Sequence, residues 1–153
     1  APAGAHARAT VARALALVDV RPQELGAVLR VTGPQDGVRA DVDPETRVVT
    51  LHVRAEPAHR VAHDIAHELG HLVDHDRMTP PARQAWLRAR GAAGRRWWPT
   101  GRLSDYATGA GDFAEAFARC HAPSPEFRSR LAPAPADACA MLDAVLDDVR
   151  GTR

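Results

Sequence analysis

Apolar residues recur at helical spacing through the middle of the chain. They stand three and four positions apart, the period that places side chains on one face of an α-helix. Pro57 precedes them and fits the first turn of a helix, where its missing N–H costs no hydrogen bond. We therefore expect a core helix beginning near Pro57, with an apolar face formed by Val61, Ala62, Ile65, Ala66, Leu69, Leu72 and Val73.

Shorter patterns on both sides predict one hairpin and further helices. Residues 38–42 and 47–54 are rich in β-branched residues and flank the turn sequence Asp43-Pro44-Glu45-Thr46, which predicts a β-hairpin. Residues 22–30 fit either a short helix or the start of a strand. The Gly-rich stretch 91–101, with Trp97 and Trp98, is expected to be a loop. Helices are expected at residues 5–20, 80–90, 112–121 and 136–150.

The length suits one domain covering residues 1–153, and the predicted elements make it α+β, mostly helical with a small antiparallel sheet. Apolar residues make up 45% of the chain and charged residues 25%, as in ordinary globular proteins. The formal net charge is +1, so no strong attraction to nucleic acid is expected. The sequence has no run of about 18 apolar residues, so no membrane span is expected either. We expect a monomer.

The core helix carries His67-Glu68-Leu69-Gly70-His71, an H-E-x-x-H motif. Histidines four residues apart share one helical face, so both can bind one metal ion. The Glu68 carboxylate can then reach a water at the metal rather than the metal itself. This pattern is typical of a catalytic zinc site. Gly70 is unfavourable inside a helix by about 1 kcal/mol, which indicates that another element packs closely there. The alternative is an ordinary core helix with histidines at its boundary.

Three further histidines, His59, His63 and His75, continue the motif at four-residue steps. Because a helical turn has 3.6 residues, this stripe drifts around the helix and its five members cannot serve one metal. We expect these three to be surface or supporting histidines. A His-striped metal-binding module is an alternative.

A catalytic zinc needs a third protein ligand, and Asp112 and Glu115 are the candidates. They are three residues apart and share one helical face. A capping pair, with Asp112 as N-cap and Glu115 as its partner, would leave both without a metal role.

The segments HELGHLVDH and SDYATGAGDFAEAFA together resemble the gluzincin peptidases, and most closely compact members similar to the catalytic domain of anthrax lethal factor. In those proteins the second helix reads E-x-x-x-E or E-x-x-x-D. The first acid binds zinc, the second orients a histidine ligand, and an upstream Tyr steadies the oxyanion. The resemblance covers roughly residues 63–118 and implies a zincin-like fold, a Zn²⁺ cofactor and a peptide or protein substrate.

The chain departs from that pattern at Gly111, where those families place the zinc-binding acid. We expect Glu115 to be the third ligand, with Asp112 as the alternative. Tyr106 matches the upstream Tyr and can donate a hydrogen bond to a developing oxyanion, although plain packing would explain it too. Trp97 and Trp98 are expected either to wall a substrate pocket or to belong to the core.

These features together predict a zinc-dependent metalloendopeptidase, a hydrolase. Zinc held by His67, His71 and an acid would polarise the peptide carbonyl. Glu68 would take a proton from water and deliver it to the leaving amine. The alternative is a non-catalytic zinc-binding or regulatory domain with a degenerate peptidase site.

The two cysteines, Cys120 and Cys139, each lie on a late predicted helix. A disulfide between those helices is expected in an oxidising compartment, and two buried thiols are the alternative. The chain opens at Ala1 without an initiator Met, which fits either removal of a signal peptide or trimming of a longer chain. A secreted protein is therefore expected, with a cytoplasmic location as the alternative.

Overall fold

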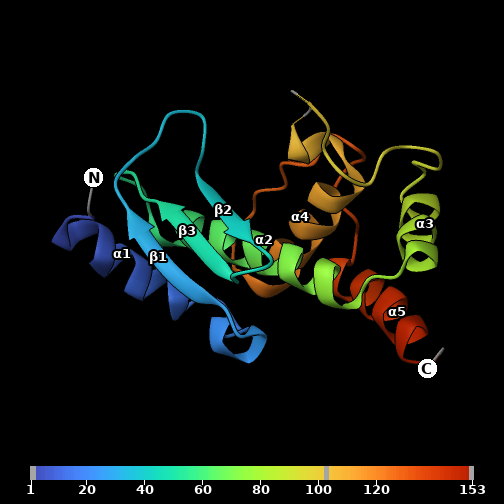
Figure 1. The fold of residues 1–153 in the computed structure, drawn as a ribbon, viewed down its shortest axis with the longest axis horizontal. Coiled ribbons are helices and arrows are strands. Elements are labelled where there is room, and N and C mark those ends of the chain that lie inside the picture. Colours follow the sequence, from blue (N-terminus) through green and yellow to red (C-terminus); the bar gives the residue numbers. More distant parts are fainter. Residues whose placement is uncertain (1–2, 102–103, 152–153) are drawn as a thin grey trace.

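The computed structural model describes residues 3–101 and 104–151. The predicted α+β class is confirmed, because helices dominate and the strands form one small sheet (Figure 1). Along the chain the elements are α1 (Ala5–Leu15), η1 (Pro22–Leu25), β1 (Val28–Thr32), β2 (Ala40–Asp43), β3 (Val48–His52), α2 (Ala58–Arg77), α3 (Pro80–Ala89), η2 (Asp105–Ala107), α4 (Gly109–His121) and α5 (Ala138–Gly151).

Helix α2 forms the centre of the fold. It runs across the molecule, with the sheet and α1 towards one end and α3, α4 and α5 towards the other (Figure 1). Pro57 is its N-cap, so the helix begins at Ala58, one residue later than expected. Every residue from Val61 to Gly70 is buried, because α1, β2, β3 and α4 all pack on this helix. A helix held on several sides fixes the directions of its side chains, as a binding site requires.

The predicted hairpin is confirmed as β2 and β3, which pair antiparallel with Asp43 opposite Val48. The Asp43 carboxylate accepts hydrogen bonds from the backbone N–H groups of Glu45 and Thr46, which stabilises the turn. The sheet is not wholly antiparallel, however. Residues 22–30 supply both η1 and the start of β1, and β1 pairs with β3 in parallel. The strand order β1-β3-β2 leaves β2 at an edge.

The close packing expected at Gly70 is confirmed. A Cβ atom added to Gly70 would lie 2.9 Å from the Cα of Ala114 and 2.9 Å from the Cβ of Phe117. Any side chain at this position would therefore push α4 away from α2. The glycine lets the two helices meet, and this brings Glu115 of α4 beside the H-E-x-x-H motif.

Two helix boundaries differ from the predicted ones. Helix α1 ends at Leu15 rather than near residue 20, because the chain turns so that Val18 enters the core and the Asp19 N–H bonds to the carbonyl of His121. Helix α4 begins at Gly109 rather than at Asp112. Its N-cap is Thr108, whose side chain accepts a hydrogen bond from the N–H of Gly111. The capping pair of Asp112 and Glu115 is therefore wrong.

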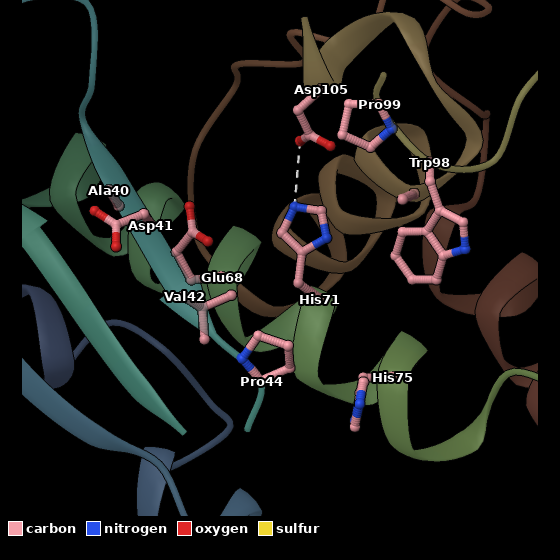
Figure 2. Close-up of a pocket in the computed structure, with 11 residues that line it drawn as sticks. Ala40, Asp41, Val42, Pro44, Glu68, His71, His75, Trp98, Pro99 and Asp105 are labelled. Carbon is pink, nitrogen blue, oxygen red and sulfur yellow. Dashed lines mark hydrogen bonds and ion pairs between the residues drawn. The ribbon is translucent and has the colours of Figure 1, made fainter. Parts of the chain in front are cut away.

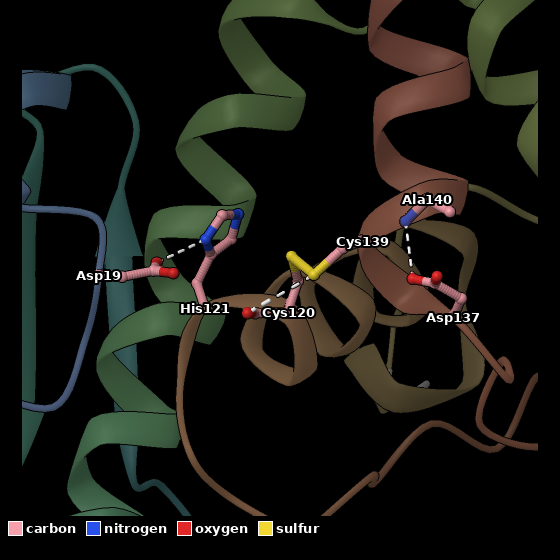
Figure 3. Close-up of a disulfide and its surroundings, with 6 residues drawn as sticks. All are labelled: Asp19, Cys120, His121, Asp137, Cys139 and Ala140. Carbon is pink, nitrogen blue, oxygen red and sulfur yellow. Dashed lines mark hydrogen bonds and ion pairs between the residues drawn. A yellow bond between two sulfur atoms is a disulfide. The ribbon is translucent and has the colours of Figure 1, made fainter.

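The predicted disulfide is confirmed. Cys120 near the end of α4 bonds to Cys139 at the start of α5, with the two Cα atoms 5.0 Å apart (Figure 3). Beside it, His121 contacts Asp19, so the end of α4 is tied to two other segments of the chain. Within the described ranges, no helix has both the length and the apolar character needed to span a bilayer.

Candidate metal centre

Three side chains that can bind a metal converge at the middle of α2. His67 and His71 project from this helix, and Asp105 reaches them from η2. The Nε2 atoms of the two histidines are 3.1 Å apart, and the Asp105 Oδ2 atom lies 3.1 Å from the first and 3.2 Å from the second. Figure 2 shows His71 rising from α2 toward Asp105.

This triangle fits a small divalent cation. A tetrahedral zinc with bonds of about 2.0–2.2 Å separates its ligand atoms by roughly 3.4 Å, close to the spacing seen here. The chemistry of the donor set agrees. When His67 is neutral and donates through Nδ1, its Nε2 carries a lone pair, which then faces the His71 ring nitrogen and a carboxylate. Three acceptors directed at one point require a proton or a metal cation between them.

Glu115 holds His67 from the opposite side of the ring. Its Oε1 lies 2.7 Å from His67 Nδ1, whereas the metal cluster lies at Nε2. The Glu115 carboxylate is fully buried and also accepts hydrogen bonds from His63 Nε2 and from the backbone N–H of Arg128. In this structure Glu115, the expected third ligand, therefore lies on the Nδ1 side of His67 and outside the group that His67, His71 and Asp105 form. Its carboxylate fixes the tautomer and orientation of the His67 ring.

Asp112 lies in a different network. Its carboxylate accepts hydrogen bonds from Trp86 Nε1 at 2.9 Å, from Arg90 Nε at 2.7 Å and from Ser129 Oγ at 2.6 Å. These contacts tie α3 and the segment after α4 to α4 itself. Asp112, the alternative ligand, therefore lies outside the group formed by His67, His71 and Asp105, and its contacts hold three segments of the fold together.

Sequence reasoning missed Asp105. The residue stands in the segment SDYATGAG, directly before Tyr106, which matches the upstream Tyr of the gluzincin resemblance. An acid next to that Tyr was the feature of the sequence that could have identified it. Its carbonyl accepts a hydrogen bond from Thr108 Oγ1 at 2.7 Å, which folds η2 back over the start of α4. That fold delivers the Asp105 carboxylate to the two histidines.

The charges of the cluster shift its pKa values. Burial alone would lower the pKa of His67, but hydrogen bonds to Asp105 and Glu115 outweigh burial and raise it well above its usual value. Burial alone would raise the pKa of Asp105, yet its hydrogen bonds to His67 and His71 hold it well below its usual range. The cluster therefore attracts a proton, and a metal ion would displace that proton on binding.

Glu68 lies next to His67 on α2 and borders the same surface hollows as Asp105. It is nearly buried, and burial raises the pKa of its carboxyl although His67 and His71 oppose the shift. Two hollows in the surface meet at Glu68 and Asp105. The groups around the candidate centre are therefore accessible from outside.

Tyr106 follows Asp105 on η2. Its ring centre is 5.5 Å from that of His67, and its hydroxyl is hydrogen-bonded to the side chain of Arg128. The phenol ring therefore lies beside the candidate centre.

The outer histidines do not join the cluster. His75 is exposed and contacts Asp76, His59 is half-buried, and His63 is buried against Glu115. The expectation of surface or supporting histidines is confirmed for these positions.

Of the two tryptophans, Trp97 belongs to the core and Trp98 lines one of the hollows.

No protein-family model, curated protein or solved structure matches this chain. Function is therefore inferred from the geometry of His67, His71, Asp105 and Glu68.

Proposed function

We propose that the protein is a zinc-dependent metallopeptidase whose metal ligands are His67, His71 and Asp105. The observation that carries the proposal is the convergence of two imidazole nitrogens and one carboxylate oxygen at 3.1–3.2 Å from one another. Nitrogen and oxygen donors in this number are typical of catalytic zinc sites, which keep a further position for water or substrate.

The chain supplies the acid–base chemistry. Zinc, when bound, would polarise the scissile carbonyl and lower the pKa of a water molecule. Glu68 accepts the proton of the attacking water and passes it to the leaving amine, a role favoured by its raised pKa. Tyr106 donates a hydrogen bond to the developing oxyanion from its place beside His67.

An extended peptide is the substrate class that the surroundings favour. Strand β2 is an edge of the sheet, and its residues Ala40 and Val42 line a hollow that reaches Glu68 and His71. An edge strand presents backbone N–H and C=O groups that can pair with an extended chain. Such pairing would carry a peptide bond across the candidate centre.

Two further features support this proposal. The H-E-x-x-H sequence on α2 resembles that of the gluzincin peptidases, although the acid in this cluster comes from η2 and not from α4. The disulfide fits an oxidising compartment, so we propose that the protein acts outside the cytoplasm. We also propose that it acts as a monomer on peptides or proteins.

A closed structural zinc site is the competing function. Such a site needs four protein ligands. Across residues 3–101 and 104–151, the cluster contains three metal-binding groups, and hollows open next to it. These observations favour a catalytic site.

Metal analysis and peptide cleavage test the proposal together. Purified protein should carry about one zinc per chain, and the double variant His67→Ala, His71→Ala should carry none. Glu68→Gln should retain zinc and fold but lose cleavage of a peptide library by several orders of magnitude. Iron in place of zinc, or Glu68→Gln activity within tenfold of the parent, would overturn it.

A further inference from the structure

One of the two hollows is walled by apolar side chains. We call it the apolar hollow. It has a volume of about 410 Å³ and borders His71 and Glu68 at the candidate centre. Val42 and Pro44 form one wall, and Trp98 and Pro99 form the wall across His71 from them (Figure 2).

The Trp98 wall is held in place although it is exposed. The indole is 47% exposed, unusual for a residue of this size. The Arg83 guanidinium lies 4.7 Å from the centre of its ring, in cation–π contact. Arg83 is in turn bound to the buried Asp74, which also accepts a hydrogen bond from Trp97. The exposed ring is therefore a preformed surface.

The second hollow, which we call the polar hollow, has a different lining. It has a volume of about 440 Å³ and is bordered by Arg39, Asp64, Ser104 and Tyr106. Arg39 forms an ion pair with Asp64, so this lining is charged and hydrogen-bonding. Both hollows border Glu68 and Asp105. A substrate crossing the centre would thus meet an apolar surface on one side and a polar surface on the other.

We propose that the apolar hollow binds a large apolar side chain of the substrate, aromatic or leucine-like, on a residue next to the scissile bond. Trp98 is the residue that determines this specificity. The inference rests on the proposed peptidase function. The hollow borders the atoms that would carry out the reaction, so its occupant belongs to a residue beside the cleaved bond.

The lining also specifies what the hollow rejects. The carboxyl groups of Asp41, Glu68 and Asp105 border it and outnumber its two imidazoles, His71 and His75, and the described lining contains no Arg, although Arg83 contacts the Trp98 ring. An acidic side chain would meet like charge there, and a small one would leave the Trp98 ring exposed to water. Substrate preference should therefore follow the order Phe or Leu, then Ala, then Glu.

A peptide library with one fixed position tests the inference. In the zinc-loaded protein, Phe or Leu next to the cleaved bond should exceed Ala by about 10- to 100-fold in kcat/KM. Trp98→Ala should lose most of this preference, with the loss appearing in KM for the Phe and Leu peptides. Leu17→Ala, which removes an exposed apolar side chain outside the hollow, is the matched control and should keep the preference.

The possible outcomes separate the two proposals. Cleavage with no preference for large apolar residues would overturn the specificity inference and leave the peptidase function standing. If no peptide is cleaved, the peptidase function fails, and calorimetry with zinc-loaded Glu68→Gln protein still tests the hollow. Phe-containing peptides should bind that protein at least tenfold more tightly than Ala-containing ones, and equal affinity would overturn the inference.

Discussion

The backbone of Asp105 lies directly against Gly111 at the start of α4. A Cβ atom added to Gly111 would be 2.2 Å from the Asp105 carbonyl oxygen and 2.8 Å from its Oδ2 atom. Only a residue without a side chain lets η2 settle at this place. The absence of a side chain at position 111 is therefore what allows Asp105 to lie beside His67 and His71.

Gly111→Ala should weaken zinc binding while leaving the fold intact. The new methyl group forces the Asp105 backbone to move and withdraws its carboxylate from the histidines. We expect zinc affinity to fall about 10- to 100-fold, the range typical when the groups that orient a metal ligand are disturbed. Titration with zinc measures the affinity, and circular dichroism checks the fold. Gly151→Ala, at a helical glycine with open space around it, is the control. Parental zinc affinity in Gly111→Ala would contradict the assignment of Asp105.

Asp105 and Asp112 should respond to replacement in opposite ways. Asp105→Ala removes the proposed metal ligand from a half-buried position, so zinc affinity should fall by more than 100-fold with a small change in stability. Asp112→Ala leaves the Arg90 guanidinium without its buried partner and should cost about 3–5 kcal/mol of unfolding free energy. Zinc titration and urea denaturation of both variants separate the two roles. Equal zinc loss in the two variants would return Asp112 to the candidate ligands.

Much of the architecture could be predicted because it is local. The spacing of Val61 to Val73 defines α2. The turn at Asp43 and Pro44 defines the hairpin. The identity of the third ligand depends instead on how η2 folds over α4, a tertiary contact between residues that no periodicity links. Glu115 illustrates the same limit. Its position in the sequence places it on α4 but does not determine which ring nitrogen of His67 its carboxylate contacts.

His63 should support the metal centre through Glu115. It is fully buried, its Nε2 atom lies 3.1 Å from Glu115, and its Nδ1 atom is the one buried side-chain polar atom without a partner in the described residues. His63 therefore donates through Nε2. Loss of this donor leaves the Glu115 carboxylate less well satisfied and His67 less firmly oriented.

Two variants distinguish this supporting role from packing alone. His63→Leu keeps the bulk and removes the donor, so zinc affinity should fall about 10- to 100-fold. His63→Gln retains an N–H donor and should recover much of that loss. The absorption spectrum of the cobalt-substituted protein reports the ligand geometry directly. If Leu and Gln variants bind zinc equally, the hydrogen bond from His63 has no part in orienting His67.

Removal of the disulfide should reduce stability without harming the metal site. Cys120 and Cys139 are 19 residues apart, and a closed loop of that length contributes about 3 kcal/mol by the chain-entropy relation. The double variant Cys120→Ser, Cys139→Ser should therefore unfold at lower urea concentration. Glu115 lies farther back on α4, and the contact between Gly70 and Ala114 holds that part of the helix against α2 independently of the disulfide. Zinc affinity at temperatures well below unfolding should equal that of the parent. A loss of zinc affinity in the folded double variant would mean instead that the disulfide positions Glu115 and, through it, His67.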